Sequence, residues 1–160
     1  MKLLIFTEGT AIMPSIAVGV TREQRVKQSS DGLPEVNDFK TYVPNGKVVS
    51  KLLSWQSQGT KIYYLTSRTE TNEIEDVRSV LQKYDFPGVD NLLFRNQDEQ
   101  YCDVVERLMP DIFIEDDCES IGADEVTYPH IDPKLKTKIK SIIVKEFEGI
   151  DHLTDDLKLL

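Results

Sequence analysis

The chain has 160 residues, of which 39% are hydrophobic and 29% are charged, and its formal net charge at pH 7 is −9. This length and composition predict one globular domain, residues 1–160, with a sizeable core. The negative charge argues against nucleic acid and anionic membranes as partners, and no apolar stretch approaches the ~20 residues of a membrane-spanning helix.

Cysteine use and the beginning of the chain favour a cytoplasmic, soluble protein. Cys102 and Cys118 lack the spacing of a disulfide framework, which is typical of a reducing compartment. The apolar run at the N-terminus is too short for a signal peptide, and Glu8 interrupts it.

Strands and helices alternate along most of the chain after residue 40. Hydrophobic residues recur at helical spacing in the expected helices and run almost without interruption in the expected strands. Such strands are typical of a parallel sheet that is covered by helices on both faces. The expected strands are Leu3–Phe6, Lys61–Leu65, Leu92–Phe94 and Asp111–Ile114, and the expected helices are Lys47–Ser57, Glu73–Tyr84 and Glu99–Leu108.

Residues 11–45 are the least regular part of the chain. Only a short helix is expected there, over Arg22–Gln28, and Thr21 and Gln24 have the spacing of a capping box for it. This segment is too long for a simple connection, and ordered segments of this kind often carry function.

The last third of the chain predicts a short strand, a helix and a tail. The short strand is Glu125–Tyr128, and the tail, residues 145–160, is an appendage or is packed on the domain. Asp132 as N-cap and Pro133 at the first helical position begin the helix. Its inward side would carry Leu135, Ile139, Ile142 and Ile143, and its solvated side would carry Lys134, Lys136, Lys138 and Lys140.

Polar clusters follow three of the expected strands. They are Thr7–Thr10, Thr66–Arg68 and Glu115–Asp117. In a parallel sheet the carboxyl ends of the strands lie at one edge, where ligands bind, so the three clusters predict a site there. The alternatives are a turn with Gly9 in a special conformation, a helix cap and a solvated strand end.

The order and spacing of these clusters resemble the haloacid dehalogenase superfamily. The family's first motif, Asp-x-Asp-Gly-Thr, corresponds to Phe6–Thr10, its second motif to Tyr63–Arg68 and its fourth motif to Ile112–Asp117. The resemblance covers roughly residues 1–130. It implies a three-layer α/β/α sandwich with a mostly parallel, Rossmann-like sheet and a minimal cap or none, with residues 11–45 as a flap or small-cap insert.

Three departures from the family concern its phosphoryl-transfer chemistry. Phe6 stands where the family has the aspartate that attacks phosphorus and binds magnesium, and a phenyl ring does neither. Glu8 replaces the aspartate that is the family's general acid/base, and it reaches one methylene further. The family's lysine is missing, and Arg95 is the nearest cation.

The resemblance also implies which residues would form the remaining site. Glu8 would be the acid/base, with its backbone carbonyl toward a magnesium ion that Glu115 and Asp116 hold. A phosphorylated or anionic ligand would bind to the anion site, whose residues are Gly9, Thr10, Thr66, Ser67 and Arg95.

Several residues keep two interpretations. Phe6 is a core aromatic at the end of a strand, or a ring that lines a pocket. Cys102 and Cys118 are small buried hydrophobes, or a redox pair in which the helix start lowers the pKa of Cys102. His130 and Asp132 are a loop residue and a helix cap, or metal ligands.

The sequence leaves three hypotheses for function. The first is a protein of this fold that has lost aspartyl-phosphate chemistry and binds a phosphorylated or anionic small molecule. The second is a divergent magnesium-dependent phosphohydrolase in which Glu8 activates water without a covalent intermediate. The third is a protein-interaction module, which includes a homo-oligomer. A concave pocket over Glu8 and Thr66 would favour a small molecule, and a flat apolar patch would favour a protein.

Overall fold

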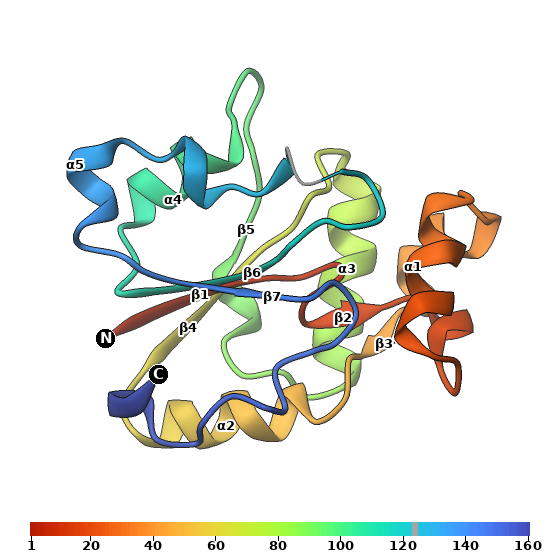
Figure 1. Cartoon of the computed structure of the whole chain (residues 1–160), viewed down its shortest axis with the longest axis horizontal. Coiled ribbons are helices and arrows are strands. Elements are labelled where there is room, and N and C mark those ends of the chain that lie inside the picture. The colour runs from red at the N-terminus through yellow and green to blue at the C-terminus, as the bar shows by residue number, and fades with distance from the viewer. Residues whose placement is uncertain (123–124) are drawn as a thin grey trace.

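Five parallel strands form the central sheet of the computed structural model, which describes residues 1–122 and 125–160. The strand order is β5-β4-β1-β6-β7, and every neighbouring pair is parallel (Figure 1). The strands are β1 (Lys2–Phe6), β4 (Lys61–Leu65), β5 (Leu92–Leu93), β6 (Ile112–Asp116) and β7 (Lys140–Val144).

The alternation of side chains along β1 divides the core between the two faces of the sheet. Leu3 and Ile5 pack in a cluster with residues of α2 (Val48–Ser57) and α3 (Thr71–Lys83). Leu4 points to the other face and packs in a cluster with residues of α4 (Tyr101–Leu108). Successive strand residues point to opposite faces, so a continuous apolar strand needs a cover on both. The predicted α/β sandwich with a parallel, Rossmann-like sheet is therefore confirmed.

The helix predicted to follow Asp132 is wrong beyond its first turn. The Asp132 side chain accepts a hydrogen bond from Lys134 N–H, but the helix α5 covers only Pro133–Lys136. The chain then forms β7, whose sequence Lys-Ser-Ile-Ile-Val is rich in β-branched residues. Capping signals define where a helix begins, and they do not define how far it extends. The lysines expected on one helix face are accordingly divided between α5, a turn and β7.

The missed strand also moves the end of β6. Asp116 pairs with Val144 and Glu115 with Ile143, so both acids lie within β6 and not after it. The fifth expected strand, Glu125–Tyr128, is also wrong, because no strand forms in these residues. A 3-10 turn covers Tyr128–His130, and the N–H groups of Thr127 and Tyr128 donate to the Glu115 carboxylate and not to a strand.

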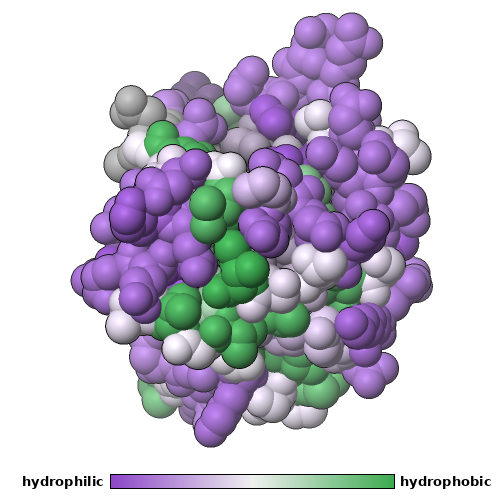
Figure 2. All heavy atoms as spheres, turned by 90° about the vertical axis from the view of Figure 1, so that its right-hand side faces the viewer, coloured by the Kyte–Doolittle hydropathy of each residue, from purple (hydrophilic) through white to green (hydrophobic). Residues whose placement is uncertain are grey.

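Residues 11–45 form a compact insert beside the sheet. Its two ends pair as a short antiparallel ribbon, β2 (Ile12–Met13) with β3 (Val43–Pro44). Helix α1 (Arg22–Ser30) begins with the predicted capping box. The 3-10 turn Phe39–Thr41 packs against α3. The face of the molecule on this side shows a strip of apolar surface between hydrophilic side chains (Figure 2).

The tail after β7 is packed on the domain. Phe147, Ile150, Leu157 and Leu160 are all buried. The segment runs along α2 (Figure 1), where Trp55 Nε1 donates to the Thr154 carbonyl at 3.1 Å. Among the helices of residues 1–122 and 125–160, none combines the length and apolar character that crossing a membrane would need.

Candidate functional site

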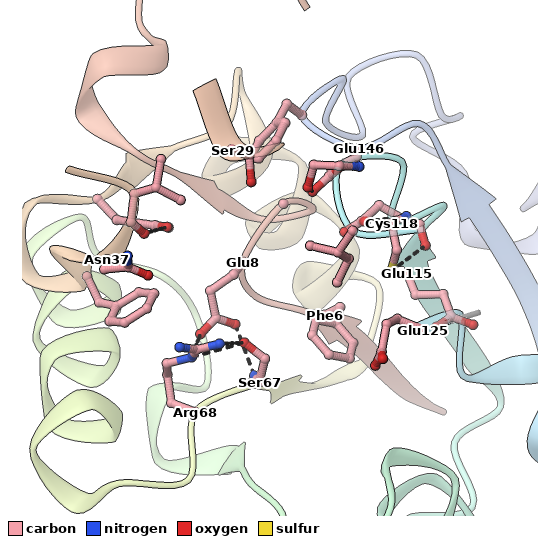
Figure 3. A pocket seen from close by; sticks show the side chains of 18 of the residues that line it. Phe6, Glu8, Ser29, Asn37, Ser67, Arg68, Glu115, Cys118, Glu125 and Glu146 are labelled. Carbon is pink, nitrogen blue, oxygen red and sulfur yellow. Dashed lines mark hydrogen bonds and ion pairs between the residues drawn. The ribbon is translucent and has the colours of Figure 1, made fainter. Parts of the chain in front are cut away.

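A cavity of about 260 Å³ lies at the carboxyl edge of the sheet, under the insert (Figure 3). Each of the three predicted polar clusters contributes to its lining, through Glu8, Ser67 and Asp116. The insert adds a further wall, and its aromatic members there are Phe39 and Tyr42. The loop after β7 closes the cavity with Glu146 and Phe147. The edge is concave, and the insert covers it as a small flap.

The Glu8 carboxylate is held by donors of the second cluster. Its Oε1 accepts from the Thr66 hydroxyl at 2.5 Å, and its Oε2 accepts from the Ser67 N–H at 3.2 Å. The Thr7 hydroxyl donates to the same Oε2. Arg68 Nε lies 3.7 Å from Oε1 and forms an ion pair with it. Glu8 therefore occupies the hydroxyl and amide donors that the resemblance assigned to an anionic ligand.

The other residues predicted for the anion site are also engaged within the chain. The Gly9 N–H donates to the Ile12 carbonyl at 2.9 Å. The Thr10 hydroxyl donates to Asp116 Oδ2 at 2.7 Å. Arg95 lies over the Tyr101 ring, 4.1 Å from its centroid, and donates to the Ser67 carbonyl at 3.5 Å. Neither Thr10, Thr66 nor Arg95 is among the residues that line the cavity.

The two acids predicted to hold magnesium accept hydrogen bonds on every carboxylate oxygen. Glu115 accepts from the N–H groups of Thr127 at 2.7 Å and Tyr128 at 2.8 Å. Asp116 accepts from Cys118 N–H on Oδ1 at 3.0 Å, and from a hydroxyl on Oδ2. In residues 1–122 and 125–160, no three His, Cys, Asp or Glu side chains are grouped to hold a metal ion. The residues present do not fit a magnesium site.

Burial shifts the titration of the acids in this cavity. It raises the pKa of Asp116 to about 6, and the charges of Asp117 and Glu115 add to the shift. Burial also raises the pKa of Glu115, against its two backbone hydrogen bonds. Burial likewise raises the pKa of Glu146. Removal from water disfavours the charged form of a carboxyl group, and only part of that cost is recovered here.

Glu146 is a member of the site that the sequence did not suggest. It is buried, and its two oxygens accept from the N–H and the hydroxyl of Ser120, both at 2.7 Å. Glu146 lies just after β7. A sequence analysis that predicted this strand would have placed Glu146 at the same edge of the sheet as the three polar clusters. Gly9 packs between these acids, since a Cβ there would lie 2.8 Å from Asp116 Oδ2 and 3.4 Å from Glu146 Cγ.

Phe6 packs against the core on the α4 face of the sheet and also lines the cavity, so both of its interpretations apply. Its ring meets that of Tyr101 edge to face, with 5.2 Å between the centroids. Arg68 belongs to the second predicted cluster but was not assigned to the anion site, and its guanidinium lies 4.4 Å from the Phe39 ring centroid. The cap interpretation of the second cluster is wrong, because α3 begins after Glu70 and no side chain caps it.

The cysteines do not form the reactive pair that was considered. Burial raises the pKa of both thiols, and for Cys102 it outweighs the lowering by the backbone N–H groups at the start of α4. Only Cys118 lines the cavity. Raised thiol pKa values leave little thiolate at neutral pH, so both residues act as small apolar side chains.

Comparison with known proteins gives similarity of structure and none of sequence. Neither a protein-family model nor a curated protein matches the chain. The Class C acid phosphatase from Bacillus anthracis has a TM-score of 0.59 at 14% identity, over 92% of this chain and 67% of the phosphatase. The same enzyme with tungstate bound has a TM-score of 0.57, also at 14% identity, over 92% and 68%.

A further similar structure is the Pnkp1/Rnl/Hen1 complex. Its TM-score is 0.53 at 16% identity, over 91% of this chain and 46% of the matched chain. Together with the parallel sheet, these comparisons confirm the predicted α/β fold with a Rossmann-like sheet. At such low identity they show the fold alone.

Proposed function

We propose that this protein binds a small organic molecule in the cavity under the insert and forms no aspartyl-phosphate. The observation that carries the proposal is Phe6, which ends β1 and lines the cavity at the position where the family has its attacking carboxylate. A phenyl ring has no lone pair with which to attack phosphorus. A concave cavity with aromatic walls and a few polar groups is typical of small-molecule sites.

The contacts of the site support a ligand that uses neither the predicted anion site nor magnesium. A phosphorylated or anionic ligand would have to displace Glu8 from Thr66 and Ser67, which already donate to it. Magnesium would have to share Glu115 and Asp116 with the hydrogen-bond donors that already serve each of their carboxylate oxygens. Each lost hydrogen bond to a charged group costs about 1.5–3 kcal/mol, which opposes the binding of an anionic ligand.

The test compares the wild-type protein with the Phe6→Asp variant in the hydrolysis of p-nitrophenyl phosphate, with and without Mg²⁺. We expect no turnover by the wild-type protein under either condition. The variant restores a carboxylate at the position of the family's nucleophile, so any turnover that it gains over the wild-type protein is due to that group. Wild-type turnover that Glu8→Ala or Asp116→Ala abolishes would overturn the proposal.

The second candidate is a divergent hydrolase that moves protons without a covalent intermediate. The observation in its favour is Asp116, a cavity-lining carboxyl whose pKa burial raises to about 6. A general acid or base works best when its pKa lies near the working pH. Asp116 would then share or replace the role that the sequence predicted for Glu8. Hydrolytic activity with an apparent pKa near 6 that Asp116→Asn removes would favour this candidate.

The third hypothesis, a protein-interaction module or homo-oligomer, would use the surface of the insert. The strip of apolar surface in Figure 2 lies on that side of the molecule, and the exposed apolar side chains of the insert include Val18 and Leu33. The concave cavity favours the small-molecule function over this one. Light scattering over a range of protein concentrations distinguishes a monomer, which we expect, from an oligomer.

A further inference from the structure

The charges that line the cavity are strongly unbalanced. Of the described residues in its lining, one carries a guanidinium group, Arg68, and five carry carboxyl groups. Burial raises the pKa of three of these carboxyls, and the charges of neighbouring acids add to the shift for two of them. A positive charge that entered the cavity would lower the cost of ionising these groups. The five carboxyl residues are Glu8, Glu115, Asp116, Glu125 and Glu146.

Arg68 does not offset this imbalance for a ligand. It pairs with Glu8 at 3.7 Å and with Glu73 at 3.8 Å, and its guanidinium stacks on the ring of Phe39. Its charge is thus shared between two acids of the chain. An anion in the cavity would be repelled by five acids and attracted by one positive charge that is already shared. A cation would be attracted by the five acids and repelled by that one charge.

The walls of the cavity supply aromatic rings as well as acids. Phe6, Tyr42 and Phe147 line it, and no cation of the chain is recorded over their rings in the described residues. In Figure 3 the Phe6 ring lies between Glu8 on one side and Glu125 on the other. The face of an aromatic ring is negative and attracts a cation, most strongly where water is excluded. The Arg68–Phe39 pair shows this interaction already made in the same cavity, with 4.4 Å from guanidinium carbon to ring centroid.

The same features distinguish an organic cation from a metal ion. A hard divalent ion needs several oxygen ligands gathered around one point, and the described residues hold no group of three such side chains. Acids on opposite walls with rings between them suit a diffuse charge on an apolar body. The volume of about 260 Å³ equals roughly nine waters at about 30 Å³ each, which restricts the ligand to a small molecule.

We propose that the cavity binds a small organic amine in its ammonium form, with the apolar body against Phe6, Tyr42 and Phe147 and the charge between Glu8 and Glu125. This inference rests on the proposed function, because it names the class of ligand for the same cavity. Phe6 then has a role of its own. The ring that stands in place of the attacking carboxylate packs against the bound ligand.

The test uses three probes that share one body and differ in charge: benzylamine, benzyl alcohol and benzoate. Binding to the full-length protein is measured at pH 7 by calorimetry and by the shift of the unfolding temperature, with inorganic phosphate as a further anion. We expect benzylamine to bind at least tenfold more tightly than benzyl alcohol, and benzoate and phosphate to bind more weakly still. Equal affinity for the amine and the alcohol, or preference for an anion, would overturn the inference.

Two variants locate the ammonium group in the cavity. Glu125→Gln should weaken benzylamine binding by about three- to tenfold and leave benzyl alcohol binding within twofold. Phe6→Leu should weaken the binding of both probes, because both pack their ring on Phe6, and should weaken benzylamine binding more. Glu148→Gln, which makes the same change of charge at an exposed residue outside the cavity lining, is the matched control and should have no effect. Weakening by Glu148→Gln equal to that by Glu125→Gln would mean that net charge alone acts, and would overturn the inference.

The outcomes separate this inference from the proposed function. If the alcohol or an anion binds and the amine is not preferred, the proposed small-molecule site still holds and only the inferred class of ligand, an amine, is refuted. No binding of any probe to the cavity, together with turnover of phosphate esters by the wild-type protein, would remove both.

Discussion

Replacement of Glu8 by alanine should free the donors that Glu8 occupies in the cavity and allow an anion to bind there. Glu8 accepts from the Thr66 hydroxyl and the Ser67 N–H, and Thr66 is fully buried. Without the carboxylate these donors lose their acceptor, whereas the Thr7 hydroxyl keeps the Leu65 carbonyl at 3.1 Å. The two vacated donors and the freed Arg68 then form a site for phosphate or tungstate.

The size of the effect follows from the two donors that lose their partner. An unsatisfied buried donor costs about 1–3 kcal/mol, and water that enters the space recovers part of this, so we expect a loss of about 2–4 kcal/mol. For a domain of this length each kcal/mol lowers the unfolding temperature by about 2–4 °C, which gives a decrease of roughly 5–15 °C. Phosphate at ten times its dissociation constant should restore about 1.4 kcal/mol, or roughly 3–6 °C.

The assay is thermal unfolding of the wild-type protein, Glu8→Ala and Glu8→Gln, each in phosphate and in chloride at equal ionic strength. Glu8→Gln is the matched control because its amide keeps an acceptor oxygen for Thr66 and leaves less room for an anion. We expect phosphate to raise the unfolding temperature of Glu8→Ala alone. An equal phosphate effect on the wild-type protein would refute the reasoning that Glu8 fills the anion site.

Two further predictions concern the acids beside Gly9. Burial raises the pKa of Asp116 from 3.8 to about 6, so the native state binds this proton more tightly than the unfolded chain, and stability is lost as pH rises through that interval. The free energy of unfolding of Asp116→Asn, measured in urea, should therefore rise by up to roughly 3 kcal/mol relative to that of the wild type between pH 4 and pH 7. A difference between the two proteins that does not change with pH would contradict this. Gly9→Ala should lower the free energy of unfolding by about 1–3 kcal/mol more than Gly19→Ala in the same measurement. Both glycines have positive φ, but only at Gly9 does the added Cβ meet Asp116. Equal losses for the two variants would show that the close approach of Asp116 has no cost.

The sequence by itself determined four of the five strands of the sheet, all but β7, and the edge at which the site lies. Buried strands such as Leu3–Phe6 and Lys61–Leu65 could be predicted because an apolar run bounded by polar residues is local information. Parallel strands then require their carboxyl ends to meet, so Glu8, Ser67 and Asp116 were expected at one edge before any coordinates were known. The sequence also has Phe6 at the end of the first strand, where the resemblance places the family's nucleophile.

Only the tertiary structure decided what the residues at this edge contact. Pairing with β6 makes a strand of Lys140–Val144, because a strand depends on a partner that is distant in the sequence. Hydrogen bonds between distant residues likewise place the Glu8 carboxylate on the donors predicted for a ligand, and enclose Glu115 between two backbone N–H groups. A motif specifies which groups reach an edge. Which of them already have partners depends on packing across the whole fold, and here packing leaves a cavity of acids and aromatic rings.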